Sequence, residues 1–309
     1  MTTNNTTRIS ILIATRNRTN DLFKCIQSIS EIDYSNYETI ILDQSDDEAS
    51  SIQIQSYIES INAHYKYIHS DIKGKSNALN TLLHVASGDL FALTDDDTLV
   101  PKNWLSNIAS EFDKYSDVDI MLGQVQPIMQ EDGSHKICIP GFQFKNFLRL
   151  PKGNVDGMGA NMAMRSSLLL KVMFYDPLLG PGAPMPASEE GDFIYRAQLN
   201  NAIVMHNPNI KLMHFGGRTP EEWGALYYSY GCGDAGFAIK HLRCGDSRII
   251  RRIIKNCSLM FRRYLIRCYK KTRHDELLYL RGVLHGIKLG FSFPINKIER
   301  LYLDKNAPS

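Results

Sequence analysis

The sequence has few of the features that mark membrane-spanning or secreted proteins. No uncharged apolar run approaches the ~20 residues that a helix needs to cross a bilayer, and the opening MTTNNTTR holds no apolar signal segment. The six cysteines form no Cys-x-x-Cys pair, which argues against zinc and redox sites. We therefore expect free thiols in a cytoplasmic protein, either soluble or peripheral on the inner face of the membrane.

The composition is that of a globular enzyme or binding protein. Hydrophobic residues make up 43% and charged residues 22% of the 309 residues, enough for a sizeable core, and the chain shows neither internal repeats nor low-complexity tracts. This length favours one large domain, alone or with an appendage.

Charge is unevenly distributed along the chain. Residues 245–309 contain 15 Lys/Arg and 5 Asp/Glu, a balance of +10, so the net charge of +2 leaves −8 for the preceding 244 residues. Within this tail, residues 248–271 combine nine Lys/Arg with apolar residues at helical spacing. Such a helix either lies on an anionic membrane or packs on the rest of the protein, and the pattern leaves both open. No recognised motif supports nucleic-acid binding.

The first hundred residues alternate between apolar, β-branched runs and segments of helical periodicity. This alternation predicts an α/β fold with a parallel sheet covered by helices, whose ligands bind beyond the carboxyl ends of the strands. Polar clusters follow the first, second and fourth of these strands. The expected strands are 8–14, 37–43, 64–69 and 89–94, and the expected helices are 19–32, 49–62 and 75–86.

The rest of the chain is less regular. We expect a strand, a turn marked by Asp-Gly, a glycine-rich segment that becomes a strand, a loop rich in proline and glycine, and a helix with an acidic first turn. These fall at 119–127, 130–134, 155–166, 178–186 and 188–201, and the chain is expected to be largely helical from 220 onward.

The acidic triplet Asp95-Asp96-Asp97 directly follows a predicted buried strand. Three adjacent carboxylates repel one another unless a cation or solvent neutralises them. A hard divalent metal takes oxygen ligands and also bridges phosphate oxygens. The sequence therefore predicts a metal site here, although an acidic turn facing water would have the same pattern.

A second segment, GKSNALN, precedes and opens the predicted third helix. Gly74 permits close approach of the backbone to a ligand, Lys75 can face a phosphate near the start of the helix, and Asn80 lies farther along the same helix. Alone, this is an ordinary amphipathic helix preceded by a glycine.

Taken together, six segments resemble glycosyltransferase family 2, whose catalytic domain has the GT-A fold. They span residues 8–217 in the family's order: ILIATRNR, IILDQSDDE, GKSNALN, ASGDLFALTDDDT, GMGANMAMRSS and SEEGDFIYR. The resemblance implies a catalytic domain at 1–219, followed by a basic helical region at 220–309. It also implies a nucleoside diphosphate sugar as donor, UDP by preference, Mn²⁺ or Mg²⁺ as cofactor, and a saccharide or lipid-linked saccharide as acceptor.

The resemblance also assigns the donor site. Asp95 matches a residue that binds ribose or metal, Asp97 the metal ligand, and Asp96 the variable position between them. Gln44 stands where a second aspartate is common in the family, so contacts with the base are expected to differ. The residues expected to bind the nucleotide sugar are Ala14, Thr15, Arg16, Asp43, Lys75, Asn80, Asp95, Asp96, Gly159, Asn161 and Arg218.

The acidic stretch SEEGD resembles the motif that supplies the catalytic base. Inversion at the anomeric carbon needs a carboxylate that takes the proton of the acceptor hydroxyl. Glu190 is the first choice and Glu189 the second, and Arg196 is expected to orient them. By the same resemblance His214 lies near the diphosphate or metal, and imidazole is a usable metal ligand. Both acids could equally be ordinary first-turn residues of a helix.

The prediction from sequence is thus an inverting glycosyltransferase of polysaccharide or glycoconjugate synthesis. The first alternative is a nucleotidyltransferase acting on sugar phosphates. Such an enzyme usually has a glycine-rich phosphate loop in the first strand-to-helix turn, whereas this turn reads ATRNRTND, without glycine. The second alternative is an inactive binding or scaffold protein of the same fold, which retention of Asp95, Asp97 and the Glu189-Glu190 pair argues against.

Overall fold

A computed structural model describes residues 7–61, 64–128, 141–172, 174–270 and 276–304. The predicted turn at 130–134 and Cys138 lie outside these residues. The chain divides into two compact units, each built from separate stretches of sequence. We call them the sheet unit, with residues Met1–Lys73, Asn77–Phe174 and Ala197–Gly217, and the helical unit, with Gly74–Ser76, Tyr175–Arg196 and Arg218–Ser309. The predicted domain boundary at residue 219 stays a prediction.

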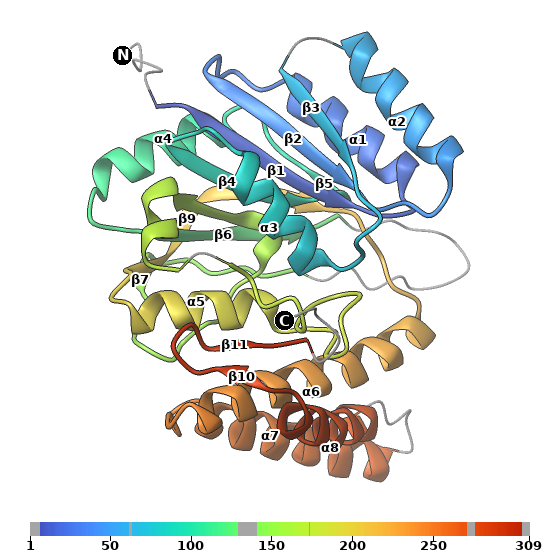
Figure 1. The fold of residues 1–309 in the computed structure, drawn as a ribbon, viewed down its shortest axis with the longest axis vertical. Helices are drawn as coiled ribbons and strands as arrows, with labels where there is room; N and C mark the ends of the chain where they lie inside the picture. The colour runs from blue at the N-terminus through green and yellow to red at the C-terminus, as the bar shows by residue number, and fades with distance from the viewer. Residues whose placement is uncertain (1–6, 62–63, 129–140, 173, 271–275, 305–309) are drawn as a thin grey trace. The chain divides into compact units, whose positions relative to one another are not determined.

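Within the described residues, nine strands form the central sheet of the sheet unit (Figure 1). Their order is β3-β2-β1-β4-β8-β6-β9-β5, and β7 pairs with β9. The strands are β1 (Ile9–Thr15), β2 (Tyr37–Asp43), β3 (Tyr65–His69), β4 (Leu90–Asp95), β5 (Thr98–Leu99), β6 (Ile120–Pro127), β7 (Leu148–Arg149), β8 (Met162–Arg165) and β9 (Val204–His214).

The sheet is mainly parallel, as the sequence predicts. Strands β1, β2, β3 and β4 pair in parallel, and so do β6 and β9. Strand β8 is antiparallel to both β4 and β6, and β5 and β7 are antiparallel to β9. The predicted α/β class with a mainly parallel sheet is confirmed, with these three strands reversed.

Three helices of the first half lie where periodicity predicts them, and a fourth, at Trp104–Lys114, was not predicted. The four helices of the first half are α1 (Thr19–Ser30), α2 (Glu48–Ile61), α3 (Lys75–Val85) and α4 (Trp104–Lys114), and two short 3₁₀ helices lie at Gly159–Asn161 and Ser166–Leu170. The predicted helices that match α1, α2 and α3 end within two residues of the observed ends. Helix α1 buries Leu22, Cys25, Ile26 and Ile29, the residues of its apolar stripe.

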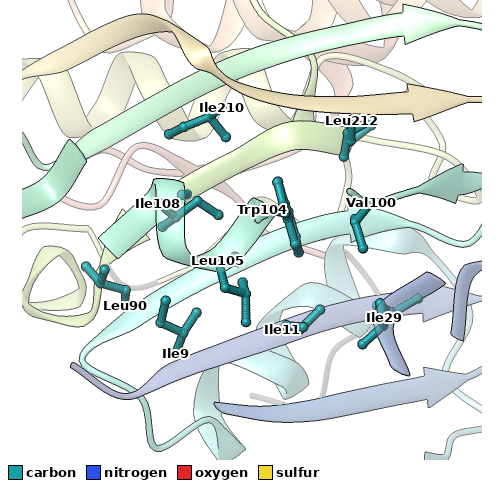
Figure 2. Packing of buried hydrophobic residues seen from close by; sticks show 14 of the residues in the cluster. Ile9, Ile11, Ile29, Leu90, Val100, Trp104, Leu105, Ile108, Ile210 and Leu212 are labelled. Atoms are coloured by element: carbon teal, nitrogen blue, oxygen red, sulfur yellow. The ribbon is translucent and has the colours of Figure 1, made fainter. Parts of the chain in front are cut away.

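The core of the sheet unit lies between this sheet and helices α1, α2 and α4 (Figure 2). Ile9 and Ile11 of β1 point to the same face because side chains alternate along a strand. From α4, the fully buried indole of Trp104 packs into the same cluster, together with Ile108. Truncating a buried side chain of this size typically costs about 3–5 kcal/mol, so this face anchors the strands that carry the acidic triplet.

The helical unit contains the C-terminal helices that the sequence predicts. Its elements are α5 (Glu189–Leu199), whose last three residues belong to the sheet unit, α6 (Pro220–Arg243), α7 (Ile250–Lys270), α8 (Glu276–Ser292), β10 (Ile295–Asn296) and β11 (Leu301–Tyr302). Helix α6 begins with a capping box, because Thr219 accepts from the Glu222 amide and Glu222 accepts from the Thr219 amide.

Helices α6 and α8 pack with their backbones in direct contact. A Cβ atom at Gly231 of α6 would overlap the Tyr279 carbonyl, and one at Gly286 of α8 would overlap the Cys232 carbonyl. Only glycine leaves room for such close packing. Across the described parts of the chain, no helix combines the length and apolar character needed to cross a membrane.

Candidate active site

The carboxyl ends of the central strands bring the predicted polar residues together. In the sheet register, Ala14 of β1 lies opposite Asp95 of β4, and Thr15 lies opposite Asp43 of β2. Because these strands are parallel, all of them end at the same edge of the sheet. Ala14 is half-buried and Thr15 is buried, whereas the next residue, Arg16, is exposed.

The acidic triplet is buried rather than solvated. Asp96 and Asp97 are 4% and 3% exposed. The Thr15 hydroxyl donates to Asp96 at 2.7 Å. The Arg18 guanidinium lies 3.1 Å from a carboxylate oxygen of Asp96 and 3.2 Å from one of Asp97. Arg18 thus supplies positive charge that the triplet requires, a role the sequence analysis did not assign to it.

Burial changes the pKa of Asp96. Desolvation raises the pKa of this carboxyl to about 6, the neighbouring Asp97 and Asp95 add to the increase, and Arg18 opposes it. A further positive charge at this loop would favour the ionised carboxylate.

His214, at the end of β9, completes this part of the site. Its Nε2 atom lies 3.1 Å from an Asp97 carboxylate oxygen, and the residue is 4% exposed. The contact follows from strand pairing, since His214 lies opposite Thr98 of β5. The other ring nitrogen, Nδ1, is buried and has no hydrogen-bonding partner among the described residues.

The backbone after β9 closes over Asp97. The Phe215 amide donates to the Asp97 carbonyl at 3.0 Å, and a Cβ atom at Gly216 would overlap the Asp97 carboxylate. Glycine at 216 is therefore required by the carboxylate beside it. The sequence HFGG carries this signal, although nothing in the sequence alone says which side chain the glycine accommodates.

Asp97 and His214 suit a divalent cation in donor chemistry. One hard carboxylate and one imidazole, both buried, are ligands that Mn²⁺ accepts, and the orphaned Nδ1 shows that the imidazole is not fully satisfied by the described part of the protein. Among the described residues, no group of three or more His, Cys, Asp or Glu side chains converges as a metal site. In donor chemistry, Asp97 and His214 would offer a cation a pair of ligands rather than a closed protein cage.

Asp43 is held by neighbours in the sheet unit. One carboxylate oxygen accepts from the amide and hydroxyl of Ser45 at 2.8 and 2.5 Å, and the other accepts from Ser51 and Tyr67 at 3.1 and 2.9 Å. The residue is fully buried. Four donors fix the orientation of this carboxylate, and its predicted contact with the nucleoside stays a prediction.

Two other predicted nucleotide-binding residues lie on the same unit. Arg16 forms an exposed ion pair with Asp46 at 3.0 Å. Hydrogen bonds from Asn17, and then from Lys73 and Arg16, hold the pKa of Asp46 well below its usual range. Asn80 is half-buried on α3. The structure does not bring Arg16 to the acidic triplet, whereas Arg18, two residues later, contacts it.

The predicted sugar-contacting loop is buried in the sheet unit. Gly159 and Asn161 form the short 3₁₀ helix before β8. The Asn161 side chain accepts from the Trp104 indole at 3.1 Å and donates to the carbonyls of Gln124 and Ile210 at 2.8 and 3.3 Å. These three partners join α4, β6 and β9, so Asn161 has a structural role beside its predicted one.

The predicted base lies in the helical unit, in the first turn of α5. Glu189 is 4% exposed, while the Glu190 side chain is 25% exposed. Lys75 lies 3.1 Å from Glu190 and 3.9 Å from Glu189. Lys75 was expected to face a phosphate, and the structure pairs it with the two acids, of which Glu190 is 115 residues away in sequence.

The remaining predicted residues of this unit have other partners. Arg196, expected to orient the glutamates, donates to Asp192 at 2.8 Å inside the unit. Lys240 also lies 2.8 Å from Asp192, and these charges hold the pKa of the buried Asp192 far below its usual range despite its desolvation. Arg218 is half-buried just before α6. The glutamates are thus followed in the same helix by a fully paired carboxylate.

Comparison with known sequences gives the family. The family model of Glycosyl transferase family 2 matches residues 10–173, more than half of the chain. WcaA of Escherichia coli strain K12, whose name assigns it to colanic acid biosynthesis, is 36% identical over 106 residues, 34% of this chain and 36% of WcaA. Glycosyltransferase GlyG of Streptococcus pneumoniae serotype 4 is 23% identical over 137 residues, 44% of this chain and 45% of GlyG. The chain spans less than half the length of either relative.

Solved structures share the fold. The mannosyltransferase PcManGT from Pyrobaculum calidifontis, solved with GDP-Man and Mn²⁺, has a TM-score of 0.61 at 13% identity, with 95% of this chain and 84% of that chain covered. S. aureus TarS 1-349, solved with UDP-GlcNAc, has a TM-score of 0.53 at 17% identity, with 74% and 66% covered. The segments that first indicated the family lie mostly within the matched residues, and the fold is that of its catalytic domain. The chain belongs to glycosyl transferase family 2.

Proposed function

We propose that this glycosyltransferase moves a sugar from a nucleoside diphosphate sugar to an acceptor hydroxyl, with inversion at the anomeric carbon. The observation that carries the proposal is the buried Asp97–His214 pair at the carboxyl edge of a family 2 sheet. Two structural neighbours were solved with GDP-Man and with UDP-GlcNAc, which supports a nucleotide sugar as donor. UDP is the first candidate nucleotide, and the acceptor is a saccharide or lipid-linked saccharide of polysaccharide or glycoconjugate synthesis.

The sheet unit would bind the nucleotide. Ala14, Thr15 and Asp43 lie at the ends of adjacent strands, and we assign them to the nucleoside. Asp97 and His214 would hold Mn²⁺ or Mg²⁺, with Asp95 as a further candidate. When bound, the cation would neutralise charge that develops on the departing diphosphate. Arg18 already offsets part of the negative charge of the triplet and holds Asp96 and Asp97 in place.

The helical unit would supply the base. Glu190 is the more exposed of the two acids, so we assign it the proton of the acceptor hydroxyl, and we assign Glu189 a supporting role. The ammonium of Lys75 lies 3.1 Å from one carboxylate oxygen of Glu190 and gives this side chain a partner within the unit. Removing that proton as the hydroxyl attacks is typically worth about 10²–10⁴-fold in rate.

A donor screen tests the proposal. Thermal shift and calorimetry with UDP-GlcNAc, UDP-glucose, UDP-galactose and GDP-mannose, each with and without Mn²⁺, should single out one nucleotide whose binding requires the cation. Hydrolysis of that sugar nucleotide should then release nucleoside diphosphate and an anomerically inverted sugar, followed by NMR. Metal-independent binding of every donor, or retention of configuration, would overturn the corresponding part of the proposal.

Helix α7 supports a peripheral membrane location for this activity. One apolar stripe, with Ile253, Cys257 and Met260, packs inside the helical unit against Ala235, Tyr279 and Val283. A second set of apolar side chains is 40–59% exposed: Ile254, Leu259, Phe261, Leu265 and Ile266. The helix carries seven Lys/Arg and no Asp/Glu.

The packed stripe and the exposed apolar set of α7 have different roles. Packing of this stripe explains why α7 is docked, and it leaves the exposed apolar set on the same helix as exposed Arg251, Lys255, Arg262 and Arg263. Exposed apolar and basic side chains on one helix match an anionic lipid surface. We propose that α7 attaches the enzyme to such a surface, where a lipid-linked acceptor would lie.

A further inference from the structure

We propose that Asp234 of α6 is a positioning residue for the catalytic base. In this proposal, Asp234 holds Ser188 in the backbone conformation that presents Glu189 and Glu190 at the start of α5. The inference rests on the proposed role of Glu190, and it concerns a residue that the sequence analysis did not single out.

The chain enters α5 through a strained residue. Ser188, directly before Glu189, has a φ of +70°. This left-handed region is unfavourable for residues with a side chain, including serine. Such a conformation persists only where the surroundings hold it in place. The question is therefore which contacts hold Ser188.

Asp234 makes that contact and is itself held from two sides. One of its carboxylate oxygens accepts from the Ser188 hydroxyl at 2.9 Å. The other accepts from the Tyr279 hydroxyl of α8 at 2.8 Å and from the Asn256 amide of α7 at 3.2 Å. Burial, reinforced by Asp234 itself, raises the pKa of Tyr279, so the phenol keeps its proton and remains a donor. The carboxylate is fixed between three helices and can fix Ser188 in turn.

The backbone of α6 supports the same segment directly. A Cβ atom at Gly233, next to Asp234, would overlap the Ala187 carbonyl, and one at Gly236 would overlap the Met185 sulfur. Residues 185–188 therefore pack against the α6 backbone where Gly233 and Gly236 leave room for them. The Ser188–Asp234 hydrogen bond locks a segment whose path is already limited by packing.

A second attachment lies just after the glutamates. Asp192 accepts from Lys240 at 2.8 Å and lies 2.9 Å from His241 Nε2, and both of these residues are also on α6. Glu189 and Glu190 are thus bracketed by two contacts with one helix, at Ser188 and at Asp192. Holding catalytic groups in place before substrate binds raises the rate of the chemical step, because no reorganisation is needed.

The test exploits the different needs of serine, alanine and glycine at a positive φ. Asp234→Ala should lower kcat for hydrolysis of the donor found in the screen by about 10²-fold, while KM and the calorimetric affinity for that donor stay unchanged. Ser188→Gly in the Asp234→Ala background should restore most of kcat, since glycine adopts this φ without a tether. Ser188→Ala, which keeps the strain and loses the hydroxyl, should not restore it.

Asn256→Ala is the matched control. It removes one donor to Asp234 and leaves the Ser188 contact, so kcat should change less than about 3-fold, in line with the modest net strength of one hydrogen bond. If Asp234→Ala does not fold, the single variants carry the test: Ser188→Gly should stay near wild type and Ser188→Ala should lose kcat. Equal kcat for these two variants, or an Asp234→Ala loss that Ser188→Gly does not reverse, would refute positioning through Ser188.

Failure of this inference is distinguishable from failure of the proposed base. If the Glu190→Gln variant stays active, Glu190 is not the base, whatever kcat the Asp234→Ala variant has. An inactive Glu190→Gln variant beside an Asp234→Ala variant of wild-type kcat would leave the base in place and refute the positioning role. Hydrogen exchange gives a readout independent of turnover, because Asp234→Ala should speed exchange of the amides of residues 188–192 and leave those of β4 unchanged.

Discussion

The two acidic clusters of this enzyme are built in different ways. Asp95–Asp97 lies at the end of a strand, and its partners Thr15 and His214 are set by strand register. Glu189 and Glu190 lie at the start of a helix, after a strained serine, and depend on contacts with Lys75 and α6. Strand pairing brings the strand-end carboxylates to their partners Thr15 and His214, whereas the helix-start carboxylates depend on side-chain contacts from other segments.

This comparison predicts that substitutions in the two clusters affect different measured quantities. Substitutions at the helix-start cluster should alter turnover with little effect on donor binding, and those at the strand-end cluster should alter binding of donor and cation. The predictions below test this difference, together with α7 and His241 of the helical unit, from the largest expected effect to the smallest.

Glu190→Gln should reduce transfer by about 10²–10⁴-fold while donor affinity is retained, because an amide of the same shape cannot accept the acceptor proton. Initial rates and calorimetric titration of the same preparation give the two quantities. Glu189→Gln is the matched control and should lose less. A reversed order of the two variants would transfer the base role to Glu189.

Replacing Arg251, Arg252, Arg262 and Arg263 of α7 with Gln should weaken binding to anionic vesicles by up to about 10³-fold at low salt, since each charge near such a surface contributes about 1 kcal/mol. Co-sedimentation with phosphatidylglycerol and phosphatidylcholine vesicles measures this. Binding of the wild type should fall as salt rises because screening shortens the range of the attraction. A wild-type chain that does not prefer anionic vesicles would make α7 a packing helix only.

Asp97→Ala should weaken donor binding in the presence of Mn²⁺ by at least about 10-fold, the lower end of what loss of an outer-shell partner costs a metal site. Titrations with Mn²⁺ and with EDTA separate the cation-dependent part of the affinity. Asp96→Asn serves as control, because Asp96 is held by Thr15 and Arg18 and should matter less. Identical EDTA-sensitive affinities of Asp97→Ala and wild type would exclude the assigned metal ligand.

His241→Gln should flatten the pH dependence of stability. Burial lowers the pKa of His241, so the folded state favours the neutral imidazole, although Asp192 opposes this. The contribution of His241 to stability is fully present above pH ~6.5, the ordinary pKa of histidine, and is lost as pH falls below that value through the folded pKa. Each tenfold weakening of proton binding on folding lowers the free energy of unfolding at acidic pH by about 1.4 kcal/mol. Urea unfolding at pH 5 and 7.5 measures the difference, with the exposed His84→Gln as control. If the pH dependence of stability is unchanged, a group other than His241 causes the loss of stability at acidic pH.

The sequence predicted the strand-end cluster better than the helix-start cluster for a physical reason. Parallel strands place their carboxyl ends at one edge, so an alternating pattern locates Thr15, Asp43 and Asp95 without further information. Strand β9 escaped assignment because polar Asn207 and Asn209 interrupt its apolar pattern. In the structure, Glu111 of α4 accepts from both amides, a contact between residues almost a hundred positions apart.

Basic residues were the least predictable part of the site. Arg16 and Arg18 are equivalent in the sequence, and only the left-handed turn at Asn17, with a φ of +55°, directs one to Asp46 and the other to the triplet. Lys75 was assigned to phosphate because it opens a helix, and its pairing with Glu190 joins residues that no local pattern connects. Contacts of this kind depend on the whole unit being folded.

The helical unit is built from separate stretches of sequence, so a cut of the chain at residue 219 divides this unit. A fragment ending at residue 219 would contain Asp192 and Ser188 but lack Lys240, His241 and Asp234, leaving the buried Asp192 carboxylate without the Lys240 ammonium and the His241 imidazole. Such a fragment should be poorly soluble even though it contains the whole central sheet. Co-expression with residues 220–309 should recover it, so complementation between two inactive pieces offers a selectable assay for the packing of α5 on α6.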